Sequence, residues 1–425
     1  MNFRFLNAAL SGLMLLGLAT HAHGAADDDQ PNPKDVQVKL DVKGLRFETY
    51  DQTFKFKIGA RLHLDAAGHP GDLPLNSTGT ATVNPTDGIE VRRGRIYMGA
   101  TMLEDWEFFF DIDFADDEVA VKDMLLTYSG FDWGRFTVGS QKQPYSVGVE
   151  MSSNDLPFVE RGVDNELIIP FIDRALGGRF DSNGEHWHVA AGVYGDGIDP
   201  TETLDEGWGL AARAVYTPIL NDERILHLGF RTAYREPSSS GGEEARVRTE
   251  TTHFSNLFIS DTMPIPNTNR VILYGPEAAF ACGPFSIFGE YNRAHLEVGG
   301  GAPNLDFQSG HVALTWSLTG ESRAASYTMK SSEFKRLKPK HDFSPTNGTW
   351  GAFELATRYS YVDVSDGNTR GGQEGRISTA LNWYLNPIVR IMFDWTHVTN
   401  AKNGSITTNT ADGTDILTGR FQFMF

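Results

Sequence analysis

The last eleven residues of the chain, 415–425, constrain its fold more than any other stretch. Phe421, Phe423 and Phe425 alternate there with Arg420 and other polar residues. Successive side chains of a β-strand point to opposite faces, so the three phenylalanines share one face and the polar residues share the other. A strand that closes a membrane barrel needs such an apolar outer face against lipid and a polar inner face against water.

The same alternation recurs along the whole chain. In residues 54–64, Phe54 and Phe56 lie on one face, and Lys55 and Lys57 lie on the other. Eleven residues is about the length that a tilted strand needs to cross the hydrocarbon of a membrane. The sixteen predicted strands are residues 54–64, 89–103, 106–114, 119–128, 134–141, 175–181, 186–194, 207–217, 224–234, 271–282, 285–298, 308–318, 350–363, 375–385, 388–398 and 415–425.

The connections between these strands alternate in length, with short turns at one rim and long loops at the other, as in an up-and-down membrane barrel. Residues 319–349 break this order, because a short turn is expected there and the stretch is long and basic. Either the predicted register slips at this point or this turn is unusual. We predict an all-β fold, a 16-stranded antiparallel transmembrane β-barrel, in preference to a soluble β-sandwich, whose strands are usually shorter.

The amino-terminal end is typical of an exported protein. Arg4 precedes an apolar stretch at residues 8–19, and small residues suited to cleavage follow it. We therefore predict a signal peptide over residues 1–24, a periplasmic arm over 25–50 and the barrel domain over 51–425. This organisation predicts a protein of the cell outer membrane.

Composition excludes several other classes of protein. After the signal peptide there is no apolar run of about 18 residues, which excludes helical membrane spans. Cys282 is the single cysteine, so no disulfide can form within the chain. The formal net charge of −18 argues against a nucleic-acid partner.

The face of the strands that would line the lumen carries more arginine and lysine than aspartate and glutamate, which inverts the charge of the whole chain. Arg231 and Arg358 belong to this set. Rings of basic side chains favour the passage of anions, and guanidinium groups match the oxygens of phosphate and carboxylate. The alternative is that many of these arginines pair with neighbouring carboxylates and only brace the wall.

Two stretches focus the question of what passes through the lumen. Arg92, Arg93 and Arg95 fall within four residues, and Arg92 and Arg93 can both face inward only at a β-bulge or at the end of a strand. The long segment 142–174, which carries Arg161, is predicted to fold into the barrel and narrow it.

Catalytic motifs are absent from the sequence. It contains no Gly-x-Ser-x-Gly, no His-Glu-x-x-His and no glycine-rich phosphate loop. His186 and His188 share the lumen face but have no further ligand set beside them. We therefore expect a protein that is not an enzyme and that holds no cofactor or metal. A barrel enzyme acting on lipid is kept as an alternative from a different class.

Several motifs give the chain a family resemblance. It resembles the phosphate-selective porin O/P family of Gram-negative outer membranes. The motifs that carry this resemblance are Val-Arg-Arg-Gly-Arg-Ile at 91–96, Val-Gly-Ser-Gln-Lys-Gln-Pro-Tyr-Ser at 138–146, Phe-Val-Glu-Arg at 158–161, Gly-Ala-Phe-Glu-Leu-Ala-Thr-Arg-Tyr-Ser at 351–360 and Leu-Asn-Trp-Tyr-Leu-Asn-Pro-Ile-Val-Arg-Ile-Met at 381–392.

The resemblance implies a sixteen-stranded barrel, a homotrimer in outer-membrane lipid, that passes phosphate or other small anions by diffusion. It implies that Arg92 and Arg93 match the paired arginines of the family and that Lys142 matches the lysine that opens its third loop. Asp111 or Asp113 would then be the acidic partner beside the constriction. The complete set of candidate solute-binding residues is Arg92, Arg93, Arg95, Lys142, Arg161, Asp111, Asp113, Arg231 and Arg358.

The sequence therefore predicts an outer-membrane porin for small anions, with phosphate or polyphosphate first among the candidates. A departure from the family keeps a second reading open, because the loop 236–269 is reduced in lysine and carries acidic residues. That reading is a general or organic-acid porin without phosphate selectivity.

Overall fold

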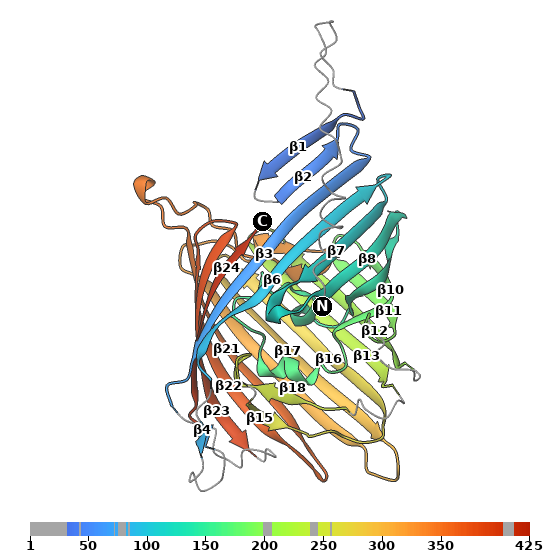
Figure 1. The fold of residues 1–425 in the computed structure, drawn as a ribbon, viewed down its shortest axis with the longest axis vertical. Helices are drawn as coiled ribbons and strands as arrows, with labels where there is room; N and C mark the ends of the chain where they lie inside the picture. Colours follow the sequence, from blue (N-terminus) through green and yellow to red (C-terminus); the bar gives the residue numbers. More distant parts are fainter. Residues whose placement is uncertain are drawn as a thin grey trace, which may run out of the picture.

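The computed structural model describes residues 32–41, 44–71, 73–74, 82–83, 86–198, 206–238, 245–255, 257–402 and 412–425. Its main sheet has 18 strands, of which β1 and β2 form an amino-terminal hairpin and the other sixteen form a barrel (Figure 1). The barrel strands are β3 (Phe54–Gly68), β6 (Gly88–Met102), β7 (Trp106–Asp113), β8 (Ala120–Phe131), β9 (Gly134–Lys142), β10 (Arg174–Asn183), β11 (Trp187–Tyr194), β12 (Trp208–Leu220), β13 (Arg224–Glu236), β16 (Thr268–Cys282), β17 (Phe285–Val298), β18 (Leu305–Ser317), β21 (Ala352–Asp366), β22 (Thr369–Tyr384), β23 (Val389–Lys402) and β24 (Asp415–Met424).

Each of the sixteen predicted segments overlaps one of these strands, and every neighbouring pair is antiparallel. The predicted fold class is therefore confirmed. The remaining elements are short: β1 (Val36–Asp41), β2 (Gly44–Thr49), β4 (Leu73–Pro74), β5 (Thr82–Val83), η1 (Ala115–Asp117), α2 (Val147–Glu150), η2 (Val163–Leu167), β14 (Arg248–Glu250), β15 (Phe258–Asp261), η3 (Ala324–Ser326), β19 (Tyr327–Thr328), β20 (Glu333–Phe334) and η4 (Pro345–Asn347).

The barrel closes where β24 pairs with β3. Arg420 of β24 lies opposite Asp65 of β3, and its Nε and Nη2 donate to the two carboxylate oxygens at 2.7 and 2.6 Å. Such a two-pronged, charge-assisted bond fixes both distance and orientation. Because both side chains are buried, it holds the register of the seam.

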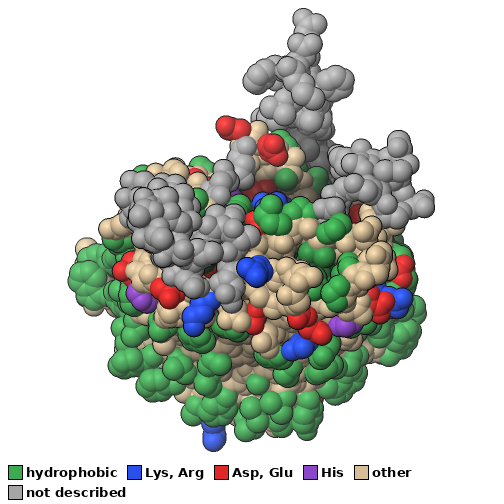
Figure 2. All heavy atoms as spheres, turned by 90° about the horizontal axis from the view of Figure 1, so that it is seen from below, with side chains coloured by type: hydrophobic (Ala, Val, Ile, Leu, Met, Phe, Trp, Pro, Cys, Tyr) green, Lys and Arg blue, Asp and Glu red, His purple; other side chains and the backbone are tan. Residues whose placement is uncertain are grey.

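The two faces of the wall differ as period-two alternation requires. On β24, Phe421 is 40% exposed on the outside, whereas Arg420 and Gln422 on the inside are 1% and 0% exposed. Figure 2 looks onto the end opposite the β1–β2 hairpin; hydrophobic side chains form its periphery and charged side chains lie across its face. The barrel therefore presents an apolar belt outward and keeps its arginines inside.

The connections follow the predicted alternation of short turns and long loops, with one exception. Residues 318–351, between β18 and β21, lie on the rim of the short turns and yet form a long connection with η3, β19, β20 and η4. The predicted register does not slip here, since β18 and β21 pair directly from Gln308–Asp363 to Ser317–Glu354. We call residues 318–351 the inner turn. The part around η4 projects from the same end of the barrel as the hairpin (Figure 1).

Within the predicted arm, residues 25–50, β1 and β2 pair as an antiparallel hairpin. β2 pairs with the end of β3 from Leu45–Ile58 to Glu48–Lys55, beyond the point where β24 stops. An unpaired strand edge is prone to unwanted pairing, and the hairpin covers this one. The predicted signal peptide, residues 1–24, lies outside the described residues.

The connection between β9 and β10, residues 143–173, folds into the barrel as predicted, and we call it the inner loop. Its Leu167 and Ile168 are fully buried in a cluster with Leu273 and Phe307 of the wall. Backbone groups of the loop also bond to the wall, for example the N–H of Val159 to Asp394 at 2.7 Å. The inner loop is thus packed against the wall and narrows the lumen.

Among the described residues, no helix is long and apolar enough to cross a membrane.

The seam gives a prediction for stability. Arg420→Gln removes the two-pronged bond and leaves the Asp65 carboxylate buried without its main partner, which should lower the free energy of unfolding by about 3 kcal/mol. Urea unfolding of the barrel in lipid vesicles, followed by tryptophan fluorescence, measures this change.

Two further variants control this test. Arg420→Gln combined with Asp65→Asn removes both charges and should recover most of the loss. Arg270→Gln removes an exposed pair with Glu297 and should change the free energy by about 0.5 kcal/mol or less. A single Arg420 variant that unfolds at the urea concentration of the unaltered protein would show that the seam does not depend on this pair.

Candidate functional site

The carboxylate of Glu160, on the inner loop, gathers three arginines of the wall. Arg92 Nε donates to it at 3.1 Å, Arg93 Nη1 at 3.3 Å and Arg420 Nη2 at 2.7 Å. Burial alone would raise the pKa of the Glu160 carboxyl, but these guanidinium groups hold it well below its usual range. The carboxylate therefore stays ionised and offsets part of the charge that the arginines bring into the lumen.

Arg92 and Arg93 reach the same carboxylate because β6 contains a bulge. Arg93 pairs with His63 and Val91 pairs with Leu64, so Arg92 is an extra residue in the strand. Of the two arrangements that the sequence allowed, a bulge or the end of a strand, the structure has the bulge. It lets two consecutive arginines approach Glu160 while the residues on either side keep their alternation.

Arg95 is held by the two aspartates that the family resemblance singled out. Its Nε donates to Asp113 at 2.7 Å, and its Nη1 donates to Asp111 at 3.4 Å. Arg61 lies 4.0 Å from the same Asp111. These aspartates therefore neutralise arginines of the wall, as expected if the arginines pair with carboxylates and brace the wall.

Arg92, Arg93, Arg95 and Asp113 face a cavity of about 920 Å³ at the end of the barrel where the long loops lie. One side of the cavity is the wall from β6 to β9, and the opposite side is the inner loop together with residues 250–253. This cavity is the part of the lumen into which most of the predicted binding residues point.

Two cations of the cavity lack a carboxylate partner among the described side chains. Lys122 forms neither a hydrogen bond nor an ion pair there, and Arg161 donates only to backbone carbonyls, those of Gly148 at 2.7 Å and Met151 at 2.8 Å. Both side chains are half-buried and line the cavity. Their positive charge is therefore available to a solute.

Lys122 faces the cavity because of a second bulge. Asp111 pairs with Asp123 and Ile112 pairs with Val121, so Lys122 is the extra residue of β8. Sequence reasoning missed it, since regular alternation from the inward-facing Asp123 places Lys122 outward. A lysine on a lipid-facing position was the signal that could have revealed the bulge.

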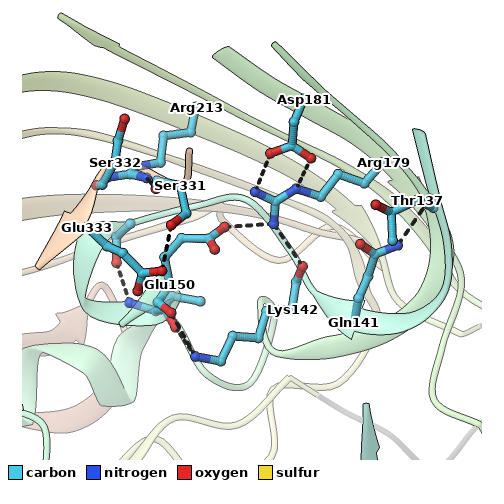
Figure 3. A network of polar contacts seen from close by, with 12 residues as sticks. Thr137, Gln141, Lys142, Glu150, Arg179, Asp181, Arg213, Ser331, Ser332 and Glu333 are labelled. Atoms are coloured by element: carbon cyan, nitrogen blue, oxygen red, sulfur yellow. Dashed lines mark hydrogen bonds and ion pairs between the residues drawn. The ribbon is translucent and has the colours of Figure 1, made fainter. Parts of the chain in front are cut away.

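Lys142 does not point into the cavity. Its ammonium group donates to the carbonyl oxygens of Val149, Glu150 and Met151 at 2.7, 3.0 and 3.0 Å, beside an ion pair between Arg179 and Glu150 at 2.8 Å (Figure 3). Lys142 thus holds the first turn of the inner loop.

Arg231 is also placed inside the wall and not at the cavity. It is 1% exposed and bonds to Glu277 at 3.3 Å, Glu290 at 3.2 Å and Asn292 at 2.8 Å. Its neighbour Arg213 shares the carboxylate of Glu277. Arg231 therefore braces β13 against β16 and β17.

Arg358 lies on the other side of Glu160. Its guanidinium carbon is 4.2 Å from the centre of the Phe158 ring, and its Nη1 donates to the carbonyl of Glu160 at 3.2 Å. It lines a smaller cavity of about 90 Å³ between the inner loop, residues 251–254 and the wall from β21 through β24 and β3 to β6. Glu160 lines both cavities.

Carboxylates face the large cavity from the inner side. Glu166 of η2 and Glu250 of β14 both line it and have no partner among the described side chains. Burial and the neighbouring Glu250 raise the pKa of the Glu166 carboxyl to about 8. No sequence pattern selects these two residues, because they come from loops whose path into the barrel cannot be predicted from alternation.

The inner turn crosses the lumen near the opposite rim and contacts walls on both sides. Arg323 bonds to both carboxylate oxygens of Glu354 at 2.7 Å. Arg213, on the far wall, donates to the carbonyls of Ser331 at 3.0 Å and Ser332 at 2.8 Å (Figure 3). Phe334 packs against the inner loop. The inner turn is therefore a second barrier in series with the inner loop.

The histidine pair noted in the sequence does not gather further ligands. His188 bonds to Asp181 at 3.2 Å, and His186 bonds to the carbonyl of Thr217 at 2.8 Å. In the part of the chain that the structure describes, no group of three or more residues could hold a metal ion.

The family of the chain follows from comparison with known proteins. The family model "Phosphate-selective porin O and P" matches residues 56–425, which comprise the whole barrel apart from the first two residues of β3. This chain belongs to that family. As an outer-membrane porin it is similar to Porin O of Pseudomonas aeruginosa, with 26% identity over 96% of this chain and 97% of that protein.

Solved structures share the fold of this porin at low identity. An anion-selective porin from Comamonas acidovorans matches with a TM-score of 0.56 and 10% identity over 88% of this chain and 100% of that chain. OmpT of Vibrio cholerae in its trimer form matches with a TM-score of 0.54 and 12% identity over 88% and 100%. These likenesses show the porin barrel and no more.

The raised pKa of Glu166 predicts that the selectivity of the porin depends on pH. Below about pH 8 the carboxyl is neutral, and above it the carboxylate adds a negative charge among Glu250, Glu160, Asp164 and Arg376. The anion-to-cation permeability ratio, measured as the zero-current potential in a potassium chloride gradient, should therefore fall between pH 7 and pH 9.

The Glu166→Gln variant should lose this step and keep the high ratio at both values. A step of the same size in the variant would assign the pH dependence to another group.

Removal of most of the inner turn should change the conductance of the channel. Residues 319–351 can be replaced by a short Asn-Gly turn, because the N–H of Leu318 already bonds to the carbonyl of Phe353 as in a hairpin. The single-channel conductance should then rise about twofold, since one of two barriers in series is gone.

A matched control removes Gly300 and Gly301 from the turn at the other rim, which should leave the conductance unchanged. A conductance of the unaltered size in the first variant would show that the inner turn does not limit the current.

Proposed function

We propose that this porin is a diffusion channel for small anions, with phosphate or polyphosphate as its principal solutes. The observation that carries this proposal is that Lys122 and Arg161 face the large cavity with no carboxylate partner among the described side chains. An anion entering from the end of the long loops gains the attraction of both charges without displacing an ion pair. The name of the family, phosphate-selective porin O and P, supports phosphate as the solute.

The candidate residues divide into four groups in this proposal. Arg161, with Lys122, attracts the anion directly. Arg92, Arg93 and Arg95 supply a basic wall whose charge is partly offset by Glu160, Asp111 and Asp113. Lys142 and Arg231 hold the inner loop and the wall in place, and Arg358 serves the smaller cavity.

A second candidate function is a general or organic-acid porin without phosphate selectivity. The pairing of Arg92, Arg93, Arg95 and Arg231 with carboxylates favours it, because paired arginines brace the wall more than they attract a solute. An effect of phosphate on the chloride current separates the two candidates.

The surroundings of the channel complete the proposal. We infer a homotrimer in outer-membrane lipid, exported by a signal peptide over residues 1–24, with the hairpin and the inner turn at the periplasmic rim. The trimeric form in which a porin of the same fold was solved supports this assembly. We also propose that the porin acts as a channel and not as an enzyme on lipid, which a lipid-hydrolysis assay on the purified barrel tests.

The selectivity of the reconstituted porin tests the main proposal. The zero-current potential in a potassium chloride gradient should have the sign of chloride, and added phosphate should reduce the chloride current. Lys122→Gln and Arg161→Gln should each lower the anion-to-cation permeability ratio about fivefold, because a unit charge about 4 Å from an ion changes its energy by roughly 1 kcal/mol in water.

Lys39→Gln, on the hairpin outside the barrel, is the control and should leave the ratio unchanged. A potential with the sign of potassium would overturn the anion proposal, and a chloride current that phosphate does not affect would favour the second candidate.

A further inference from the structure

The large cavity carries unpaired cations and unpaired carboxylates. Lys122 on the barrel wall and Arg161 on the inner loop have no carboxylate partner among the described side chains, and Glu166 and Glu250 have no side-chain partner there either. An inorganic anion uses only the two cations. The two carboxylates need a separate explanation, because unpaired carboxylates in an anion channel repel its solute.

The two carboxylates come from two loops that fold into the barrel from the same rim. Glu166 comes from η2 of the inner loop, and Glu250 comes from β14 in the connection between β13 and β16. The nearest cation, Arg376, is already engaged, since its Nε lies 2.5 Å from Glu374 and its Nη2 donates to the backbone carbonyl of Glu250 at 2.7 Å. Neither Glu166 nor Glu250 receives an ion pair from it.

Other cations of the cavity are already matched, Arg95 by Asp113 at 2.7 Å and Arg174 by Asp123 at 2.9 Å. Lys122 of the wall and Arg161 of the inner loop remain without a carboxylate partner among the described side chains. The cavity therefore holds unpaired cations as well as the unpaired carboxylates Glu166 and Glu250.

From this arrangement we infer that the cavity selects solutes carrying a phosphate, phosphonate or carboxylate group at one end and an ammonium group at the other. The anionic group lies at Lys122 and Arg161, and the ammonium group lies between Glu166 and Glu250. A cavity of about 920 Å³ accommodates a molecule several times larger than inorganic phosphate. This inference rests on the proposed anion channel and names the class of anion that it prefers.

A channel that responds only to the net negative charge of its solute should prefer the solute without the ammonium group. The inference can therefore be tested with two matched phosphate esters. 2-Aminoethyl phosphate and ethyl phosphate share the phosphate ester, but the ammonium group reduces the net negative charge of the first. In a channel that reads only negative charge, ethyl phosphate is the stronger blocker of the chloride current. In the bipolar cavity, 2-aminoethyl phosphate should block at a concentration about fivefold lower, from one added charge contact.

The experiment measures block of the chloride current through the reconstituted full-length porin by these two esters and by inorganic phosphate, at pH 9, where the Glu166 carboxyl is ionised. Glu166→Gln combined with Glu250→Gln should remove the preference for 2-aminoethyl phosphate and leave block by ethyl phosphate unchanged or stronger. Glu118→Gln is the matched control, because Glu118 is a carboxylate of the same cavity on the side of the barrel wall. It should leave the preference intact.

The outcomes separate the inference from the proposed function. If inorganic phosphate and both esters block equally well, or ethyl phosphate blocks best, the anion channel stands and the bipolar preference is overturned. If the preference survives in the doubly substituted variant, the two glutamates are not its source, and the inference also fails. If none of the three compounds affects the chloride current, the proposed phosphate channel itself is wrong.

Discussion

Lipid outside and water inside impose one rule on every strand of this barrel, and the rest of the structure depends on it. Because side chains alternate, each strand can put its apolar residues toward lipid and concentrate its charges in the lumen. Arginines crowded in this way repel one another unless carboxylates lie between them. The bond between Arg420 and Asp65 at the seam shows how the wall meets that need while fixing its own register.

The lumen is therefore organised by compensation of charge. Glu160 serves three arginines, and Glu277 is shared by Arg213 and Arg231. Against this background of matched pairs, the few unmatched groups are the ones with an effect on a passing solute. The functional character of the cavity lies in its small surplus of charges, and the number of arginines along the wall is a poor guide to it.

The sequence predicted the fold more completely than the site. Period-two alternation identified all sixteen strands, because the side chains of each strand alternate between lipid and the lumen. It also predicted a bulge or a strand end at Arg92, since two consecutive arginines cannot share a face of a regular strand, and the structure has the bulge. Alternation could not place Lys142, whose ammonium group is used by backbone carbonyls of the inner loop.

The other site residues that the sequence analysis did not predict were missed for the same physical reason. Glu166 and Glu250 enter the cavity through long loops, whose paths are set by packing inside the barrel and not by any repeating pattern. Lys122 was missed because a bulge shifts the alternation by one residue, although a lysine at a position that regular alternation turns toward lipid was a signal of that shift. The inner turn stood out in the sequence only as a connection of the wrong length for its rim.

The two bulges also affect how such a wall can change by insertion and deletion. Removing one residue from a regular strand turns the remainder of that strand inside out, which would expose charges to lipid. Arg92 and Lys122 are different, because the segments on either side of each already face the correct way. A strand can therefore gain or lose a single charged residue at these points without altering its lipid face, so the charge of the lumen can vary while the barrel stays the same.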